Sequence, residues 1–327
     1  MRTRIAVILA AVAAVSLTGA CAAPEEKAAA AAAADPSASA VSGINTGPEQ
    51  NRIVPAKDET IAARVPAGIR ATGKLTIGLG LAGSGSPPLG FTATDNKTLI
   101  GSEVDIAYAV AGVLGLEPVP ENTSWENLFI GLDSSKYNVG VSNITVTEER
   151  KQKYDFATYR LDNLAFAAKK GAGLKVTGPA DVAGRTVAVA SGTNQEKILV
   201  EWSKEAEKQG LKPVTIKYYQ TNQAVYLALN SGQIELYLGP SPSVAYQVAV
   251  DGGLEVVGTY SGAGATLQGK IALTTQKGDG LVDPLAAAVD KLIETGDYAK
   301  ILARWNLANE AVAKSEVNPE GLPIEGK

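Results

Sequence analysis

The chain has 327 residues, of which 45% are hydrophobic and 20% charged, and its formal net charge is −4. The length allows about two globular domains, and the lack of a basic excess argues against binding nucleic acid through its phosphates. The sequence has no His and a single Cys, Cys21, which excludes His-based catalytic triads, His-ligated metals, internal disulfides and cysteine-ligated zinc. We therefore expect neither a metal nor a cofactor.

Residues 1–20 have the pattern of an export signal. Arg2 and Arg4 precede an apolar run at residues 5–15, and small residues lead up to Cys21. The run is too short for an ordinary membrane-spanning helix. The Cys at the junction resembles the lipidated Cys of bacterial lipoproteins, so we expect an extracytoplasmic protein held to the cell membrane by a lipid on Cys21.

The segment that follows, residues 21–59, is predicted to be a disordered tether. It begins with a stretch rich in Ala, Pro, Ser and Glu, in which residues 28–34 are all Ala. Such a stretch has almost no apolar side chains to bury and favours a flexible linker.

From about residue 73 onward, short apolar strands alternate with amphipathic helices. We predict strands at residues 74–79, 137–145, 185–190 and 234–238. We predict helices at residues 103–116, 194–209, 221–231, 243–250 and 284–295. This alternation favours an α/β fold with a mostly parallel sheet.

The glycines of residues 78–83 match the GxGxxG pattern of dinucleotide-binding folds. That pattern requires a helix to begin at the third glycine, whereas Pro87 and Pro88 follow shortly after it. We therefore do not interpret this segment as a nucleotide site.

Three polar stretches are candidates for a ligand site. Arg150 stands where a predicted strand meets a helical turn, and Trp125 begins a predicted helix. Thr193 and Glu196 have the spacing of a capping box, so the free N–H groups of that helix start could receive an anion. Each feature also has an ordinary structural explanation: a surface ion pair for Arg150, core packing for Trp125 and a simple helix cap for Thr193.

Taken together and in order, the motifs resemble the family 3 solute-binding proteins of ABC transporters, the receptors for polar amino acids. The resemblance runs from about residue 73 to residue 307. Its motifs are Pro87-Pro88-Leu89-Gly90-Phe91, residues 99–107, Trp125, Thr145-Val146-Thr147-Glu148-Glu149-Arg150, Asp155-Phe156, Ser191-Gly192-Thr193-Asn194-Gln195-Glu196 and residues 296–305.

The resemblance implies a two-lobed periplasmic-binding-protein (Venus-flytrap) type 2 fold, in which two three-layer α/β lobes are joined by a two-strand hinge. Lobe 1 would comprise residues 60–161 and 262–310, and lobe 2 residues 162–261. A C-terminal tail, residues 311–327, would follow. The implied partners are a small carboxylate-bearing ligand and an ABC permease, and we expect a monomer.

The resemblance also implies roles for individual residues. Arg150 matches the arginine that binds the ligand carboxylate, a task for which the guanidinium fork is suited. Asn143 and Thr145 would hydrogen bond the ligand from lobe 1, and Trp125 and Phe91 would pack on it. Thr193, Asn194 and Gln195 would provide donors from lobe 2.

One position departs from the family pattern. Pro240 stands where the family usually has an Asp that binds the α-ammonium group of the ligand. Either a nearby acid such as Glu126 or Glu235 replaces that Asp, or the ligand lacks the ammonium group. Two other functions remain open: a dehydratase of cyclic dienyl acids with the same fold, and a receptor that signals instead of feeding a permease.

Overall fold

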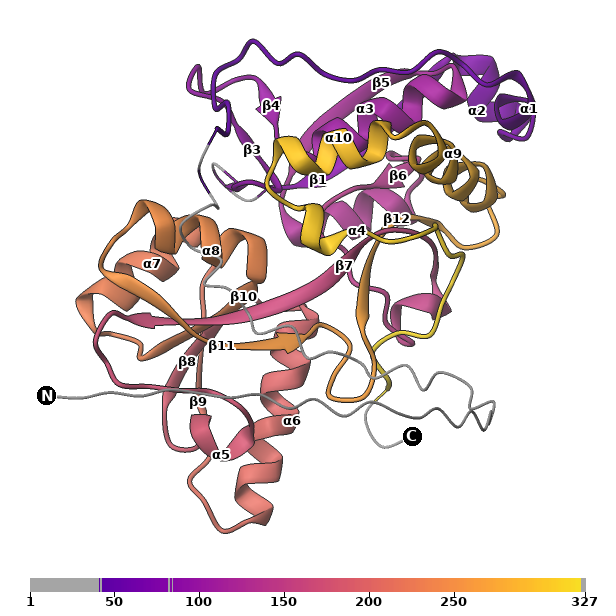
Figure 1. The fold of residues 1–327 in the computed structure, drawn as a ribbon. Helices are drawn as coiled ribbons and strands as arrows, with labels where there is room; N and C mark the ends of the chain where they lie inside the picture. Colours follow the sequence, from indigo (N-terminus) through magenta and orange to yellow (C-terminus); the bar gives the residue numbers. More distant parts are fainter. Residues whose placement is uncertain (1–40, 42, 82, 84, 325–327) are drawn as a thin grey trace, which may run out of the picture. The chain divides into compact units, whose positions relative to one another are not determined.

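The computed structural model describes residues 41, 43–81, 83 and 85–324. The predicted export signal, Cys21 and the first part of the predicted tether lie outside the described residues. All described residues belong to one of the two units into which the chain divides, residues 35–327. Their elements form two α/β lobes that share one long strand, β7 (Tyr154–Lys169) (Figure 1).

Lobe 1 contains a sheet flanked by helices on both faces. Its elements are α1 (Glu59–Ala62), α2 (Ala67–Thr72), β1 (Lys74–Gly80), β2 (Gly85–Ser86), β3 (Gly90–Thr92), β4 (Leu99–Ile100), α3 (Ser102–Leu114), β5 (Glu117–Thr123), α4 (Trp125–Asp133), β6 (Val139–Gly140), the 3-10 turn η1 (Arg150–Gln152), β12 (Gly269–Gln276), α9 (Val282–Thr295), α10 (Asp297–Arg304) and the 3-10 turn η2 (Ala308–Glu310). The strand order is β5-β1-β6-β12-β7. Helices α3, α9 and α10 bury their apolar residues in one core, and α4 buries its own in a second.

Lobe 2 has the same three-layer construction. Its elements are α5 (Pro179–Val182), β8 (Thr186–Val189), α6 (Asn194–Lys208), β9 (Thr215–Tyr218), α7 (Asn222–Ser231), β10 (Leu236–Pro240), α8 (Ser241–Val250) and β11 (Leu254–Ser261). The strand order is β7-β10-β8-β9, and β11 pairs with the other edge of β7. Helices α5 and α6 pack on one face of this sheet and α7 and α8 on the other. The predicted two-lobed α/β fold is confirmed.

The chain passes between the lobes within β7 and again between β11 and β12. β7 pairs with β12 as far as Asp162 and with β11 from Asn163 onward. A Cβ atom on Gly262 would collide with the carboxylate of Asp162, and one on Gly269 would lie 2.9 Å from the backbone nitrogen of Ala263 and 3.1 Å from the Cβ of Asp162. The two crossing segments are therefore packed tightly at this point.

The strand predicted at residues 137–145 is much shorter in the structure. Only β6, Val139–Gly140, pairs as a strand, because the backbone of Asn143 has a φ of +48° and turns the chain away. Asn tolerates this left-handed conformation better than most residues. The turn brings Ser142 and Asn143 to the edge of the sheet that faces lobe 2.

The end of the predicted tether differs from the prediction. Arg52 Nε donates to Asp105 Oδ1 at 3.1 Å, and the N–H of Asp58 donates to the carbonyl of Val113 at 2.9 Å. Ile44 and Ile53 pack against the lobe 1 core. Residues 43–58 are therefore attached to lobe 1, because this part of the segment has larger apolar side chains, Ile44 and Ile53, that the run of alanines at residues 28–34 lacks.

The predicted C-terminal tail also packs on the body of the protein. Val317 pairs with Ala157 of β7 as an isolated antiparallel bridge. Leu322 is only 3% exposed and belongs to the apolar core of lobe 2, while its backbone hydrogen bonds to Val146 of lobe 1. Residues 311–322 therefore contact both lobes.

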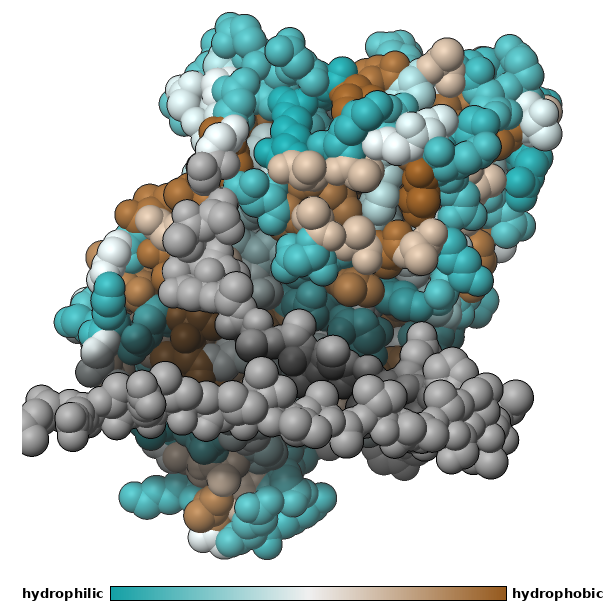
Figure 2. Space-filling view, viewed as in Figure 1, coloured by the Kyte–Doolittle hydropathy of each residue, from teal (hydrophilic) through white to brown (hydrophobic). Residues whose placement is uncertain are grey.

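Figure 2 shows a visible face on which hydrophilic residues are interspersed with hydrophobic ones. Such a mixture is ordinary for protein surfaces. Within the described residues, no helix combines the length and the apolarity that crossing a membrane requires.

Candidate functional site

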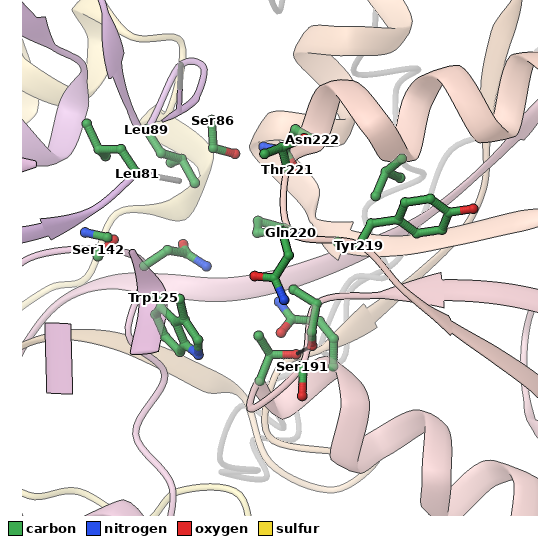
Figure 3. A pocket seen from close by; sticks show the side chains of 18 of the residues that line it. Leu81, Ser86, Leu89, Trp125, Ser142, Ser191, Tyr219, Gln220, Thr221 and Asn222 are labelled. Carbon is green, nitrogen blue, oxygen red and sulfur yellow. Dashed lines mark hydrogen bonds between the residues drawn. The ribbon is translucent and has the colours of Figure 1, made fainter. Parts of the chain in front are cut away.

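A cavity of about 160 Å³ lies between the two lobes. Figure 3 shows Leu81, Leu89 and Trp125 of lobe 1 facing residues of lobe 2 that include Ser191 and Gln220. Because residues from both lobes line the cavity, a bound solute would contact both of them at once.

The wall from lobe 1 depends on a glycine of β1. A Cβ atom on Gly80 would lie 3.4 Å from the Cα of Trp125 and 3.2 Å from Ser142 Oγ. The hydroxyl of Ser142 accepts a hydrogen bond from the N–H of Gly80 at 2.9 Å. This glycine of the GxGxxG segment therefore favours the close approach of Ser142, in the turn after β6, to β1, and that turn lines the cavity.

The wall from lobe 2 includes the start of α6. Thr193 is the N-cap, as predicted, and its hydroxyl accepts from the N–H of Glu196 at 3.2 Å. The carboxylate of Glu196 accepts from the N–H of Gly192 at 2.6 Å and thereby holds the loop before the helix. Thr193, Asn194 and Gln195 all line the cavity.

A second part of lobe 2 was not predicted from the sequence. The loop between β9 and α7, residues 219–221, and the first residue of α7, Asn222, line the cavity. Asn222 accepts a hydrogen bond from the hydroxyl of Tyr237 and donates to the carbonyl of Gly85 in lobe 1, each at 3.3 Å. The residues of this loop have no motif, and only the fold brings them to the cavity.

Arg150 lies beside the cavity and is not among the residues that line it. Its guanidinium donates to the carbonyl of Thr145 at 3.0 Å and to the carbonyl of Gly192, across the lobe boundary, at 3.1 Å. The guanidinium carbon lies 5.2 Å from the ring centre of Trp125 and 5.5 Å from that of Phe129. Among the described residues Arg150 has no ion pair with a carboxylate.

Burial lowers the pKa of Arg150 to about 10, although the charge of Asp162 acts in the opposite direction. This value is still well above neutral pH, so the guanidinium keeps its positive charge. A partly buried cation that is hydrogen bonded only to neutral carbonyls is favourably placed to attract an anion.

The side chains of Thr145 and Asn194 meet at Asp162. The Oδ2 atom of Asp162 accepts from the hydroxyl of Thr145 at 2.7 Å and from the amide of Asn194 at 3.1 Å. Asn194 also donates to the carbonyl of Gly262 at 2.9 Å. Thr145 is fully buried and does not line the cavity, so the structure uses these two side chains to join the lobes.

Phe91 was predicted to contact the ligand, and the structure places it elsewhere. It is 5% exposed, belongs to the core of lobe 1 and packs edge-on against Trp305 with ring centres 5.9 Å apart. Its position on β3, paired with Ile100 of β4, directs the ring into this core. We therefore no longer assign it to the site.

Glu103 is a cavity residue that the sequence analysis missed. It is 1% exposed and lines the cavity from the first turn of α3. Burial raises the pKa of its carboxyl group, while the nearby charge of Arg160 and a hydrogen bond from Tyr159 oppose that effect. An acidic residue in the first turn of a helix is so common that the sequence alone did not distinguish it.

The sequence offered two acids, Glu126 and Glu235, that could take the role of the family Asp missing at position 240, and the structure places them differently. Pro240 and Glu126 line the cavity, and Glu126 is exposed. Glu235 instead forms an ion pair of 2.9 Å with Arg185 and accepts from the N–H of Thr186. Glu235 is absent from the cavity lining, so it does not serve as the replacement. In the part of the chain that the structure describes, no group of His, Cys, Asp or Glu could hold a metal ion.

The chain is similar to several known proteins. The chain is 30% identical over 273 residues to the arginine-binding protein ArgT of Corynebacterium glutamicum, covering 83% of this chain and 86% of that protein. It is 34% identical over 164 residues to the L-cystine-binding protein TcyJ of Escherichia coli, covering 50% of this chain and 58% of that one.

Solved structures show the same fold. An ancestral arginine-binding protein bound to arginine is 26% identical, with a TM-score of 0.61, 71% of this chain covered and 98% of that one. The amino acid ABC transporter substrate-binding protein AbpA of Streptococcus pneumoniae has a TM-score of 0.62 at 22% identity, covering 74% of this chain and 99% of that chain. The profile of the bacterial extracellular solute-binding proteins, family 3, matches residues 79–308, and the chain belongs to this family.

Proposed function

We propose that this protein captures a small carboxylate-bearing polar solute, an amino acid or a close relative, between its lobes and delivers it to the permease of an ABC importer. The observation that carries this proposal is the position of Arg150. Its guanidinium lies beside a cavity between the lobes and has only carbonyl groups as hydrogen-bond partners among the described residues. A ligand carboxylate would form the stronger, charge-assisted pair.

The lobes make direct polar contacts around the cavity. Arg150 and Trp125 both donate to the carbonyl of Gly192, at 3.1 Å and 3.4 Å. On the other side, the hydroxyl of Ser86 donates to that of Ser243 at 2.7 Å. A solute that touches both lobes would favour this closed arrangement over an open one by its difference in affinity for the two.

The proposal includes a lipid anchor on Cys21 and a linker between the anchor and the body. A tethered receptor searches a small volume near the membrane and so meets a membrane permease at a raised effective concentration. Metabolic labelling of the full chain with a radioactive fatty acid tests the anchor. Labelling of the protein that is lost in Cys21→Ala would support it, and unlabelled protein would contradict it.

A thermal-shift screen tests the proposed ligand class. The panel contains the L-amino acids together with acetate, pyruvate and succinate as carboxylates without an ammonium group. We expect at least one carboxylate-bearing member to raise the melting temperature, because a ligand that binds only the folded state stabilises it. Isothermal titration calorimetry then gives its affinity. If no member of the panel binds, the proposed function is wrong.

A dehydratase with the same fold is a second candidate, because Glu103 is a buried carboxyl group with a raised pKa at the cavity. A raised pKa is what a general acid requires near neutral pH. Incubation with prephenate or arogenate and measurement of the ultraviolet absorbance of an aromatic product decides between the two functions. We expect no product, because the charge of Arg160 and the hydrogen bonds from Tyr159 and Asn143 favour the ionised form of Glu103, whereas a general acid must carry a proton.

A further inference from the structure

A cluster of buried charges lies next to the cavity. Arg160 is 1% exposed and pairs with the carboxylates of Glu310 and, at 3.8 Å, Glu103. Asp162, also 1% exposed, is a third carboxylate close enough to act on the charge of Arg160. Arg150 is the other cation that acts on Asp162. These residues provide three carboxyl groups for two guanidinium groups, so acidic groups outnumber basic ones.

Of the three carboxylates, only Glu103 lines the cavity. Its Oε1 accepts from the hydroxyl of Tyr159 at 2.8 Å and from the N–H of Asn143 at 2.6 Å. Its Oε2 faces Gly90, which also lines the cavity: a Cβ atom on Gly90 would lie 3.8 Å from it. One oxygen is thus hydrogen bonded within lobe 1, and the other lies near a residue that lines the cavity.

The opposite wall of the cavity contains a buried hydrogen-bond acceptor for which the described residues provide no donor. Gln195 of lobe 2 is 5% exposed and lines the same cavity, and its Oε1 has no hydrogen-bond partner in the described part of the chain. A buried acceptor without a donor is costly, and native proteins rarely leave one unsatisfied. An N–H group of a solute in the cavity would satisfy it.

We propose that Glu103 binds a cationic nitrogen group of the solute, an ammonium, amidinium or guanidinium, while Gln195 accepts an N–H from the same solute. This inference rests on the proposed function and specifies its ligand as one that carries a positive charge. Pro240 provides neither charge nor N–H at the cavity, and the carboxylate of Glu126 is exposed to water. The attraction of Glu103 for a cation is less screened, because Glu103 is buried.

The test compares Glu103→Gln with a matched control, Glu310→Gln. Both variants remove one carboxylate from Arg160, but only Glu103 lines the cavity. Affinities are measured by calorimetry for the amino acid that binds the wild type most tightly. We expect Glu103→Gln to weaken its binding at least about tenfold, and Glu310→Gln to change it less than about threefold. The melting temperature without ligand reports whether each variant is folded.

The outcomes separate this inference from the proposed function. An unchanged affinity in Glu103→Gln, or an equal loss in both variants, would overturn the role of Glu103 and leave the receptor function intact. The wild type provides a test that does not depend on a variant. If acetate, pyruvate or succinate binds it as tightly as any amino acid does, the required positive charge is refuted. If nothing binds, the proposed function itself fails.

Discussion

The guanidinium of Arg150 in lobe 1 is hydrogen bonded at 3.1 Å to the carbonyl of Gly192, the residue before the N-cap of α6 in lobe 2. The sequence motifs that contain these residues lie some forty positions apart, and the closed arrangement of the lobes joins them. The residue proposed to bind the ligand carboxylate is therefore also a contact between the lobes. A carboxylate at Arg150 would act at the boundary where closure takes place.

Replacing Arg150 should weaken ligand binding strongly. We expect Arg150→Ala to reduce the binding free energy by about 2–5 kcal/mol, because a buried charge of the ligand would lose its partner. Calorimetry with the tightest amino acid of the panel measures the change. The control is Arg185→Ala, which removes a partly exposed arginine paired with Glu235 away from the cavity. Equal affinities in wild type and Arg150→Ala would refute the assignment.

The cap of α6 should contribute measurably to stability. The hydroxyl of Thr193 accepts the N–H of Glu196 at 3.2 Å, and loss of such a cap typically costs about 1 kcal/mol. We expect Thr193→Ala to lower the free energy of unfolding in urea by that amount and Thr193→Ser to retain most of it. Similar losses in both variants would show that the methyl group, and not the hydroxyl, matters.

The fold and part of the site could be predicted from local patterns. The helices that carry apolar stripes and end in glycine, such as α3 and α7, appear within a few residues of their predicted ranges. The cap at Thr193 was recognisable because capping depends on neighbouring residues alone. The cavity is lined by five of the residues to which the family resemblance assigns ligand contacts, Trp125, Asn143, Thr193, Asn194 and Gln195. The ligand contacts themselves remain predictions.

The remainder depends on contacts between distant residues, which local patterns do not encode. Nearly all residues of β7 are buried in one lobe or the other. Its sequence therefore lacks the alternation of apolar and polar residues that marks a half-exposed strand. Thr145 and Asn194 bind Asp162, which no motif contains. Glu103 looked like an ordinary acid of a first helical turn, and only its burial beside Arg160 distinguishes it.

The C-terminal segment offers a matched pair of substitutions. Leu322 is 3% exposed in the core of lobe 2, whereas Val317 is 41% exposed on the same segment. Truncating a buried leucine to alanine typically lowers the free energy of unfolding by about 2–5 kcal/mol. Truncating an exposed residue usually changes it by no more than about 0.5 kcal/mol. We expect Leu322→Ala to lower the unfolding free energy in urea by the larger amount and Val317→Ala by the smaller one. Equally small losses of unfolding free energy in the two variants would mean that the segment does not stabilise the fold.

Ligand affinity should decrease in acid if Glu103 binds a cation. Burial raises the pKa of this carboxyl group, so it accepts a proton at a higher pH than an ordinary Glu and then loses its charge. We expect the dissociation constant of the tightest amino acid to increase as the pH falls toward the ordinary carboxyl range near about pH 4. Calorimetry over pH 4–7 measures this increase, and Glu103→Gln should abolish it. An identical pH dependence in that variant would assign the titration to another group.

The same buried carboxyls should determine how stability depends on pH. Burial raises the pKa values of Glu103, Asp162 and Glu310 in the folded protein. The folded state therefore binds protons more firmly than the unfolded chain between the ordinary carboxyl pKa, about 4, and the raised values. The free energy of unfolding is then largest at the acidic end of this interval and decreases as the pH rises through it.

Exposed acids do not obscure this effect. Hydrogen bonds from Thr98 and Thr177 lower the pKa values of Asp95 and Asp181, respectively. A hydrogen bond from Lys136 does the same for Glu121, and, although burial opposes it, one from Lys151 does so for Glu148. Such groups reduce stability only as the pH falls from about 5 downward, where the unfolded chain takes up protons first. Urea unfolding from about pH 5 to pH 7 should therefore give a free energy that decreases with pH, and Glu310→Gln should make the decrease shallower because one titrating group is gone. A free energy that increases steadily over this interval would mean that these carboxyls ionise in the folded protein as readily as in the unfolded chain.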